Sequence, residues 1–228
     1  MIIYKKIFNQ HGFSASQGKI LEIIGKNKTI LEVGSSTGYM TKSLKQSGCI
    51  VDVVEVDKKA VNETQRYARK IISNSIEDPS VTSKTLDQYD FIVMADVIEH
   101  LVDPKQALKN LFKIASSKTK LLISTPNIAG WPMRKQLFFK GDFEYQESGL
   151  LDETHLHFFT VASLPKLLKE NNWKVEDLIG TVVILPFIEK IKKMPLLGNF
   201  LANLLQRKIS TKYKNLSYYH FVVIASKI

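Results

Sequence analysis

Thr29-Ile-Leu-Glu-Val-Gly-Ser-Ser-Thr-Gly-Tyr39 is the stretch around which the rest of the chain is organised. It begins as an apolar run, Ile30 to Val33, that includes one acid, Glu32. It continues into a loop in which Gly34 and Gly38 enclose three small hydroxyl residues, and helical spacing follows. A strand, a short glycine loop and a helix N-terminus together present backbone N–H groups to a ligand. The sequence therefore predicts a ligand site here.

Two common nucleotide loops fit this stretch poorly. A nucleoside-triphosphate loop needs a lysine directly after its last glycine, and Tyr39 and Met40 follow Gly38 instead. A dinucleotide loop needs the spacing Gly-x-Gly-x-x-Gly, which Gly34-Ser-Ser-Thr-Gly38 does not have. The triphosphate interpretation is excluded and the dinucleotide interpretation is weakened.

Outward from the loop, continuous apolar runs alternate with segments of helical spacing. Strands are expected at residues 29–33, 50–56, 71–72, 91–95 and 121–124, and helices at 14–26, 39–47, 58–70 and 104–115. Continuous apolar strands alternating with helices are typical of a parallel sheet covered on both faces. The predicted fold class is α/β, a Rossmann-like, doubly wound and mainly parallel sheet in three layers.

The second half of the chain is less regular. Residues 127–160 form a long segment rich in aromatic side chains, which is expected to be a loop on the acceptor side of the site. A helix is expected at 161–171, a strand within 174–185 that is clearest at 181–185, and a last strand at 218–225.

Length and composition bound the architecture. With 228 residues and 44% hydrophobic content, residues 1–228 are expected to form a single domain. The one cysteine, Cys49, lies in an apolar run and is expected to be a packed thiol. No apolar run reaches a membrane-spanning length, and the first residues lack a secretory pattern. A cytoplasmic location is expected, with a peripheral position at the inner face of the membrane as the alternative.

Positive charge is the main compositional bias. A net charge of +10 raises nucleic acid or an anionic surface as a partner, but general lysine enrichment is the preferred explanation, and nucleic acid is not expected. Residues 186–214 have seven Lys or Arg against one acid, Glu189. They could contact an anionic membrane. Their helical apolar spacing favours two short helices that cover the sheet with lysines outward.

The loop from Glu32 to Gly38 resembles the acid-x-Gly-x-Gly-x-Gly loop of class I S-adenosylmethionine-dependent methyltransferases, with Ser36 in place of the usual middle glycine. Three further segments resemble one subfamily, and they are residues 95–104, 124–127 and 151–160. That subfamily includes ubiquinone-type O-methyltransferases and bacterial enzymes associated with cell-surface glycan clusters. Residues 131–160 look most like the latter group.

The resemblance implies a cofactor site along the carboxyl edge of the sheet. S-adenosyl-L-methionine would contact Glu32, Gly34, Ser35, Ser36, Gly38, Glu55, Val56, Ser75, Ile76, Ala95 and Asp96. An acid at the end of the second strand commonly holds a ribose diol, which fits Glu55, with Asp57 as the near alternative. Ser75 stands where the family usually has Asp, so the backbone of Ile76 would serve the adenine. The last strand would be antiparallel and pair near Val182–Leu185.

A hydroxyl acceptor has to lose a proton, which requires a base or a metal ion. Asp96, Glu99 and His100 are spaced i, i+3 and i+4, so a helix starting there would place them on one face. His100 is the best candidate base, with Glu99 beside it as a second catalytic residue. Elsewhere in the chain, His11 and His220 are expected to be surface or core residues.

The same residues also resemble a metal site. Asp96, Glu99, His100 and His155 fit the Glu-x-x-Glu-His pattern with a distant His that binds a divalent metal in small-RNA 2′-O-methyltransferases, so Mg, Mn or Zn could bind. In the alternative, Glu99 and His100 cap a helix while His155 and His157 attach the long loop to it.

Methyl transfer from S-adenosylmethionine to an oxygen acceptor is therefore the predicted function. The acceptor is expected to be a small molecule or glycan, most simply a sugar hydroxyl in surface-glycan synthesis. Methylation of a phenol or quinone precursor is a second enzymatic interpretation. A non-catalytic scaffold that binds nucleic acid or membrane is the alternative from another class.

Overall fold

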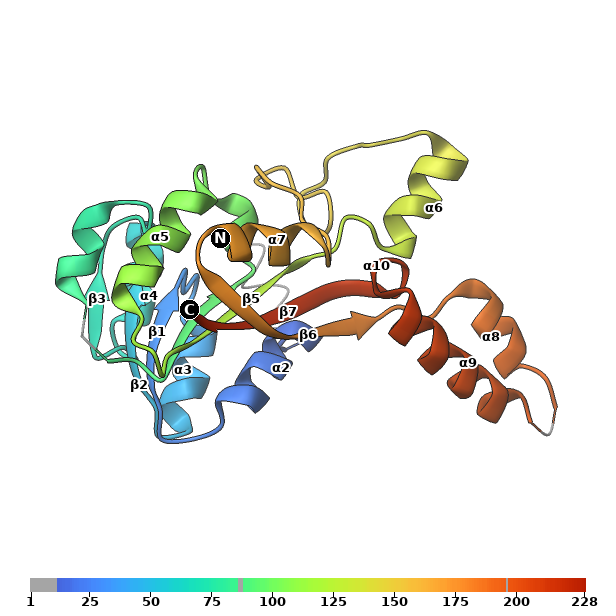
Figure 1. The fold of residues 1–228 in the computed structure, drawn as a ribbon, viewed down its shortest axis with the longest axis horizontal. Coiled ribbons are helices and arrows are strands. Elements are labelled where there is room, and N and C mark those ends of the chain that lie inside the picture. The colour runs from blue at the N-terminus through green and yellow to red at the C-terminus, as the bar shows by residue number, and fades with distance from the viewer. Residues whose placement is uncertain (1–11, 86–87, 196) are drawn as a thin grey trace.

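The computed structural model describes residues 12–85, 88–195 and 197–228. Its centre is a seven-stranded sheet in the order β3-β2-β1-β4-β5-β7-β6 (Figure 1). The strands are β1 Thr29–Val33, β2 Ile50–Val54, β3 Lys70–Ile72, β4 Phe91–Ala95, β5 Lys120–Pro126, β6 Trp173–Val182 and β7 Tyr218–Lys227. The first five strands are mutually parallel. β7 is antiparallel to both of its neighbours, as predicted.

Helices cover both faces of the sheet. The α-helices are α2 Ala15–Ile24, α3 Tyr39–Gln46, α4 Lys58–Thr64, α5 Pro104–Ile114, α6 Trp131–Lys140, α7 Ser163–Glu170, α8 Pro186–Lys192, α9 Gly198–Lys212 and α10 Lys214–Ser217. Two short 3-10 helices are η1 Pro79–Lys84 and η2 Ile98–His100.

Two hydrophobic clusters lie on opposite faces of the strands. Successive residues of β1 alternate between them: Ile30 packs with α2 and α3, and Leu31 packs with α5 and α7. Both side chains are fully buried, which explains why the strands have continuous apolar runs rather than alternating ones. The predicted three-layer α/β fold is confirmed. Cys49 is buried in the same cluster as Ile30, as predicted for a packed thiol.

Several predicted boundaries were wrong. β6 pairs with β7 from Trp173 to Val182, so the strand lies earlier than the apolar run 181–185 indicated. The end of that run is apolar because Leu185 is buried in a small separate cluster with Ile188 and Ala202, and not because it belongs to the strand. The second strand ends at Val54 rather than 56, and the helix expected at 58–70 ends at Thr64. The long segment 127–160 also contains a helix, α6, which the sequence interpretation missed.

The basic segment 186–214 does form two helices, but they do not cover the sheet. Figure 1 shows α8 and α9 packed on each other and projecting beyond the ends of β6 and β7. Leu185, Ile188 and Ala202 form a small buried cluster there, with Trp131 of α6 packed against it. The preferred interpretation of sheet-covering helices was therefore wrong. Within the described residues, no helix combines the length and the apolar character that a membrane crossing requires.

Candidate active site

The glycine loop after β1 turns through three residues with left-handed backbone conformations. Gly34 has φ +74°, Ser36 φ +49° and Gly38 φ +71°. A Cβ atom on Gly34 would lie 2.6 Å from Cγ2 of Val97, so the loop is pressed against the segment that follows β4. Glycine at position 34 is thus required by backbone angle and by space, as in a loop that lets backbone approach a ligand closely.

Ser36 takes up a conformation that costs a non-glycine residue about 1–2 kcal/mol. Glycine at this position would avoid that cost. The serine is accommodated because its backbone N–H donates to Glu55 at 3.0 Å, which holds the strained residue in place.

Glu55 ties the loop to the end of β2. Its Oε2 accepts hydrogen bonds from the backbone N–H groups of Ser35 at 2.8 Å and Ser36 at 3.0 Å. Its Oε1 accepts from the backbone N–H groups of Val56 at 2.9 Å and Asp57 at 3.0 Å. The carboxylate is thus a structural organiser of the loop as well as the predicted ribose ligand. Asp57, the alternative, caps α4 by accepting from the backbone N–H groups of Lys59 and Ala60.

Glu32 lies behind the loop and is buried. Its Oε2 accepts a hydrogen bond from the Thr41 hydroxyl at 2.6 Å. Burial raises the pKa of Glu32 to about 7; the Thr41 hydrogen bond opposes the shift and the charge of Glu55 adds to it. The strand that leads into the loop therefore contains a carboxyl group whose pKa lies close to neutral pH.

A cavity of about 510 Å³ opens beside the loop. Its volume lies within the range of roughly 300–1,000 Å³ that small-molecule and cofactor sites usually have. Its lining includes the predicted cofactor residues Gly34, Ser36, Glu55, Val56, Ala95 and Asp96. The glycine cradle and this acid-lined cavity fit S-adenosylmethionine, which is cationic. The predicted residues Glu32, Ser35, Gly38, Ser75 and Ile76 do not line it.

Two of those residues have other partners. The hydroxyl of Ser75 donates to Glu77 at 3.1 Å and accepts from the backbone N–H of the same residue. Ile76 is buried, and its carbonyl accepts from the side-chain amide of Asn110 at 2.8 Å. Their predicted role near the adenine stays a prediction.

A second cavity, of about 370 Å³, adjoins the first. The two share four lining residues, which are Gln17, Tyr39, Asp96 and His100. Asp96 has a left-handed backbone conformation with φ +57°, and its Oδ1 accepts from the Ser124 hydroxyl at 2.7 Å. The shared residues form the boundary between the two cavities. We call the first the donor cavity and the second the acceptor cavity, after the roles that the sequence predicts for their residues.

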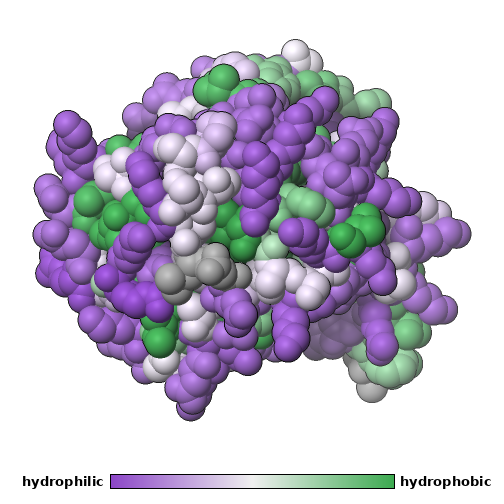
Figure 2. Space-filling model, turned by 60° about the vertical axis from the view of Figure 1, so that its left-hand side comes forward, coloured by the Kyte–Doolittle hydropathy of each residue, from purple (hydrophilic) through white to green (hydrophobic). Residues whose placement is uncertain are grey.

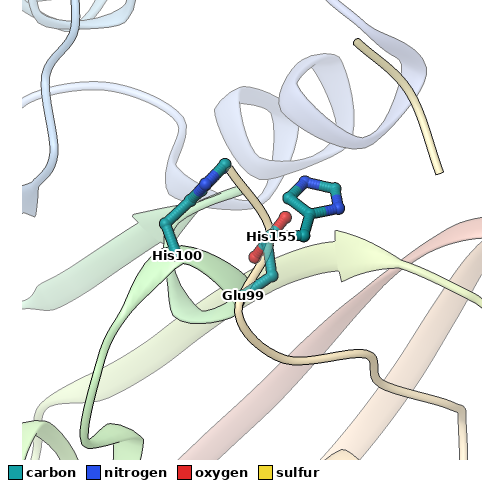
Figure 3. A group of neighbouring side chains, drawn as sticks. All are labelled: Glu99, His100 and His155. Atoms are coloured by element: carbon teal, nitrogen blue, oxygen red, sulfur yellow. The ribbon is translucent and has the colours of Figure 1, made fainter. Parts of the chain in front are cut away.

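Glu99, His100 and His155 meet in the acceptor cavity (Figure 3). One ligand atom from each lies within 4.8 Å of the others. Glu99 is only 1% exposed, and within the described residues neither of its carboxylate oxygens makes a hydrogen bond of good geometry. Burial, followed by the nearby charge of Asp96, raises its pKa well above the usual value.

The two imidazole rings have defined orientations. Nδ1 of His100 lies 3.1 Å from the carbonyl oxygen of Thr154, and Nδ1 of His155 lies 3.3 Å from that of Leu150. A carbonyl oxygen can only accept, and the Thr154 hydroxyl, 3.0 Å from Nδ1 of His100, donates its own hydrogen to Asp152 Oδ1 at 2.6 Å. In the neutral rings each Nδ1 therefore has the hydrogen and each Nε2 has a lone pair. Burial, followed by the charge of His100, lowers the pKa of His155 and favours its neutral form.

The predicted helical face of Asp96, Glu99 and His100 was wrong. η2 begins only at Ile98, and Asp96 lies outside it in a left-handed conformation. Asp96 is accordingly absent from the close group of metal-ligating atoms found among the described residues. His155 does reach the site, because the backbone N–H groups of Leu156 and His157 both donate to the carbonyl oxygen of Glu99. The long loop is thus attached to η2 by backbone as well as by imidazole.

The sequence interpretation missed some site residues. His220 lines the acceptor cavity, because the register of β7 pairs it with Pro126 at the end of β5. Gln17 and Tyr39 line both cavities and contact each other through a hydrogen bond of 2.9 Å. Burial and the charge of Asp96 raise the pKa of Tyr39 to about 12, so it stays a neutral phenol. The antiparallel register of the last strand was the signal that could have placed His220, whereas His11 lies outside the described residues.

Comparison with known proteins agrees with this geometry. A family model described as a methyltransferase domain matches residues 8–178, and the chain therefore belongs to that family. The ubiquinone biosynthesis O-methyltransferase of Coxiella burnetii is 26% identical over 164 residues, which cover 60% of this chain and 70% of that protein. The enzyme of the same name from Aeromonas salmonicida is 24% identical over 159 residues, covering 67% and 66%.

Solved structures share the fold. A SAM-dependent methyltransferase from Archaeoglobus fulgidus superposes with a TM-score of 0.65 at 14% identity, covering 98% of this chain and 99% of that one. A SAM-dependent methyltransferase from Thermotoga maritima, described as a possible histamine N-methyltransferase, has a TM-score of 0.64 at 15% identity, covering 99% and 94%. The protein is an S-adenosylmethionine-dependent methyltransferase.

Replacing Ser36 by glycine should stabilise the protein. Glycine removes the left-handed penalty and costs some unfolded-chain entropy, so the free energy of unfolding should rise by about 0.5 kcal/mol. Urea titration measures this. The matched control is Ser35→Gly, which loses the hydroxyl contacts to Glu55 and Thr64 and should destabilise by about 1 kcal/mol. A Ser36→Gly protein less stable than wild type would contradict the strain argument.

The cofactor-free protein should lose stability as pH rises through the range in which Glu32 ionises. The pKa of Glu32 is about 7 in the folded protein, against an ordinary value of 4.5, so folding favours its protonated form. The stabilisation is complete below the ordinary pKa and is lost as pH approaches the folded one, a change on the order of 3 kcal/mol.

Denaturant titrations at several pH values would check this against Glu32→Gln, which should show a shallower decline. The raised pKa of Glu99 also lowers stability as pH rises, but it does so in both proteins. The difference between the two pH slopes therefore reports on Glu32 alone. The exposed residue Glu147 provides the control, because Glu147→Gln should keep the wild-type slope. Equal slopes for wild type and Glu32→Gln would overturn the assignment.

Proposed function

We propose that this methyltransferase transfers its methyl group to a hydroxyl oxygen, most simply that of a sugar in cell-surface glycan synthesis. The observation that carries the oxygen acceptor is the group of Glu99, His100 and His155 in the cavity next to the donor cavity. An oxygen nucleophile needs its proton removed, and His100 offers a lone pair at the boundary between the two cavities.

When bound, S-adenosylmethionine supplies an electrophilic methyl group on a sulfonium. The residues of this chain have three tasks around it. Gly34 and Ser36 let the loop approach the donor, and Asp96 lies at the boundary where donor and acceptor meet. The acceptor proton would pass to Nε2 of His100 as the oxygen takes the methyl group, and the electron pair of the methyl–sulfur bond would return to sulfur, which leaves S-adenosylhomocysteine. A positive charge on His100 would favour the ionised form of Glu99, whose pKa burial otherwise raises, and the carboxylate would then stabilise the imidazolium. Alignment of the two substrates supplies much of the remaining acceleration.

Two features support a sugar acceptor. Residues 131–160 resemble enzymes associated with surface-glycan clusters. In the structure this segment has an aromatic group in which Phe143 contacts Tyr145 and Phe158, with ring centroids 5.9 and 5.6 Å apart. Phe158 also lies 6.2 Å from the His155 ring, so the group borders the acceptor cavity. Phe143 and Tyr145 are exposed, so they offer flat apolar surfaces to a ligand.

A phenol or quinone precursor is the second candidate. The relatives from Coxiella burnetii and Aeromonas salmonicida have the name ubiquinone biosynthesis O-methyltransferase, and the aromatic group would also stack on a phenol.

As an alternative to the base role of His100, we propose that Glu99, His100 and His155 hold a divalent metal ion, and in that case the metal rather than His100 activates the acceptor hydroxyl. A buried carboxylate gains a partner from a cation, and two imidazoles whose Nε2 atoms can offer a lone pair are suitable ligands. Three protein ligands leave an open position, as in catalytic metal sites. The ion, whether Mg, Mn or Zn, would act as a Lewis acid toward the acceptor hydroxyl. Asp96 lies outside the group, so the predicted fourth ligand is not part of this proposal.

A panel of nucleotide sugars and phenols should identify the acceptor through a product mass increased by one methyl group. We expect a nucleotide sugar or glycan to react, and His100→Gln to lower turnover of that acceptor at least about 100-fold because the base is lost. Affinity for S-adenosylhomocysteine should change little.

His157→Gln is the matched control, because His157 lies outside both cavities of the proposed site. Methylation of phenols alone would favour the second candidate. Full turnover by His100→Gln with the reacting acceptor would remove His100 as the base.

Metal binding predicts that purified protein retains a divalent ion that elemental mass spectrometry detects. Glu99→Gln and His155→Ala should lower the retained metal to background, since each removes one of three ligands. His157→Ala should retain it. Exhaustive chelation should lower turnover, and return of the metal should restore it. Metal-free protein with full turnover would overturn the proposal while leaving the base role of His100 intact.

A further inference from the structure

The hairpin of α8 and α9 leaves a row of large apolar side chains in solvent. The exposed fractions of the side chains of Met194, Leu197, Phe200, Leu201 and Leu204 lie between 44% and 66%. The small buried cluster of the hairpin contains none of these five residues. By contrast, Figure 2 shows a face of the molecule on which hydrophilic side chains predominate and hydrophobic ones form separate patches. Contiguous apolar exposure of this kind marks an interaction surface.

The row occupies one side of α9. Leu197, Phe200, Leu201 and Leu204 recur at helical spacing, and Arg207 and Lys208 continue the same side one turn further on. The opposite side contains Ala202, Leu205 and Ile209, which pack against α8 in the small buried cluster. The exposed side is therefore apolar toward the tip of the hairpin and cationic toward its base.

The charge of the hairpin is strongly one-sided. Residues 186–214 have seven Lys or Arg against Glu189, and within the described residues none of these cations forms an ion pair. Exposed apolar side chains beside cations match the two layers of an anionic bilayer. The apolar side chains would contact the acyl chains, and the cations would contact the phosphate headgroups. Nucleic acid would match the cations but would leave the apolar row in water.

The position of the hairpin relates this surface to the active site. β6 ends and β7 begins at the edge of the sheet that holds the acceptor cavity, because Val182 pairs with Tyr218 and Pro126 pairs with His220. α6 follows β5 from that same edge, and its Trp131 packs against the hairpin. α6 also exposes Phe138 and Phe139, at 83% and 70%, and has cations but no acid. Figure 1 shows both elements at one end of the molecule.

We propose that the α8–α9 hairpin, aided by α6, is a docking surface for an anionic lipid bilayer. Docking places the edge of the sheet with the acceptor cavity next to the membrane. The docking itself does not depend on the identity of the methyl acceptor, so it is tested by binding rather than by turnover.

Co-sedimentation of the full chain with lipid vesicles tests this inference. The protein should pellet with vesicles of phosphatidylglycerol and phosphatidylcholine at low salt, should be released as salt rises, and should not pellet with phosphatidylcholine alone. Lys190→Gln combined with Lys193→Gln should lower the vesicle affinity roughly thirtyfold, because each lysine near the surface contributes about fivefold. Leu197→Ser combined with Phe200→Ser should lower it about tenfold or more.

Matched controls lie at the other edge of the sheet. Lys113→Gln combined with Lys118→Gln removes the same charge from exposed positions near the start of β5 and should bind vesicles like wild type. Unchanged affinity for S-adenosylhomocysteine shows that each variant is folded. The proposal is overturned if wild type ignores anionic vesicles at low salt, binds neutral vesicles equally, pellets without vesicles as a self-associated form, or loses binding equally in hairpin and control variants.

Discussion

The carboxylate of Glu55 organises the donor side of this protein. Its four short hydrogen bonds join the glycine loop after β1 to the turn after β2, and both segments lie at the carboxyl edge of the sheet. Charge-assisted bonds to backbone N–H groups are among the stronger hydrogen bonds in proteins. Without them the left-handed conformation of Ser36 would have little to support it. The loop therefore depends on an acid from the neighbouring strand as much as on its own glycines.

This edge of the sheet concentrates acidic side chains in a chain with a net charge of +10. Glu32, Glu55 and Glu99 are all buried there, and Asp96 lies between the two cavities. Burial of neighbouring acids raises the pKa of Glu32 and of Glu99, which is a cost to the empty protein. A cationic sulfonium cofactor, and a metal ion if one binds, would relieve that cost. The buried acidic groups that destabilise the free enzyme when they ionise thus favour binding of cationic ligands.

The glycine loop after β1 was predictable from the sequence because it is local. Gly34, Ser36 and Gly38 lie within one turn, and the strand that leads into them has a plain apolar signature. The acceptor side was less predictable because it depends on register and on distant segments. Asp96 does not lie on the expected helical face because its own backbone has a left-handed conformation, which residue spacing alone does not reveal. His220 enters the cavity only through the pairing of β7 with β5.

The hairpin shows a different limit of sequence interpretation. Helical apolar spacing is the same whether a helix packs on a sheet or presents its apolar side to another medium. What distinguishes the two cases is the area available for burial, and that follows from topology. β6 ends and β7 begins at the edge of the sheet, so their connection projects beyond the core. Among the described residues, the small buried cluster there is formed by the connection itself, with Trp131 of α6 packed against it. A chain that ends its sheet with an antiparallel strand can place such a connection beside the active site. Under the docking proposal, the exposed apolar side of α9 would serve access to the acceptor rather than folding.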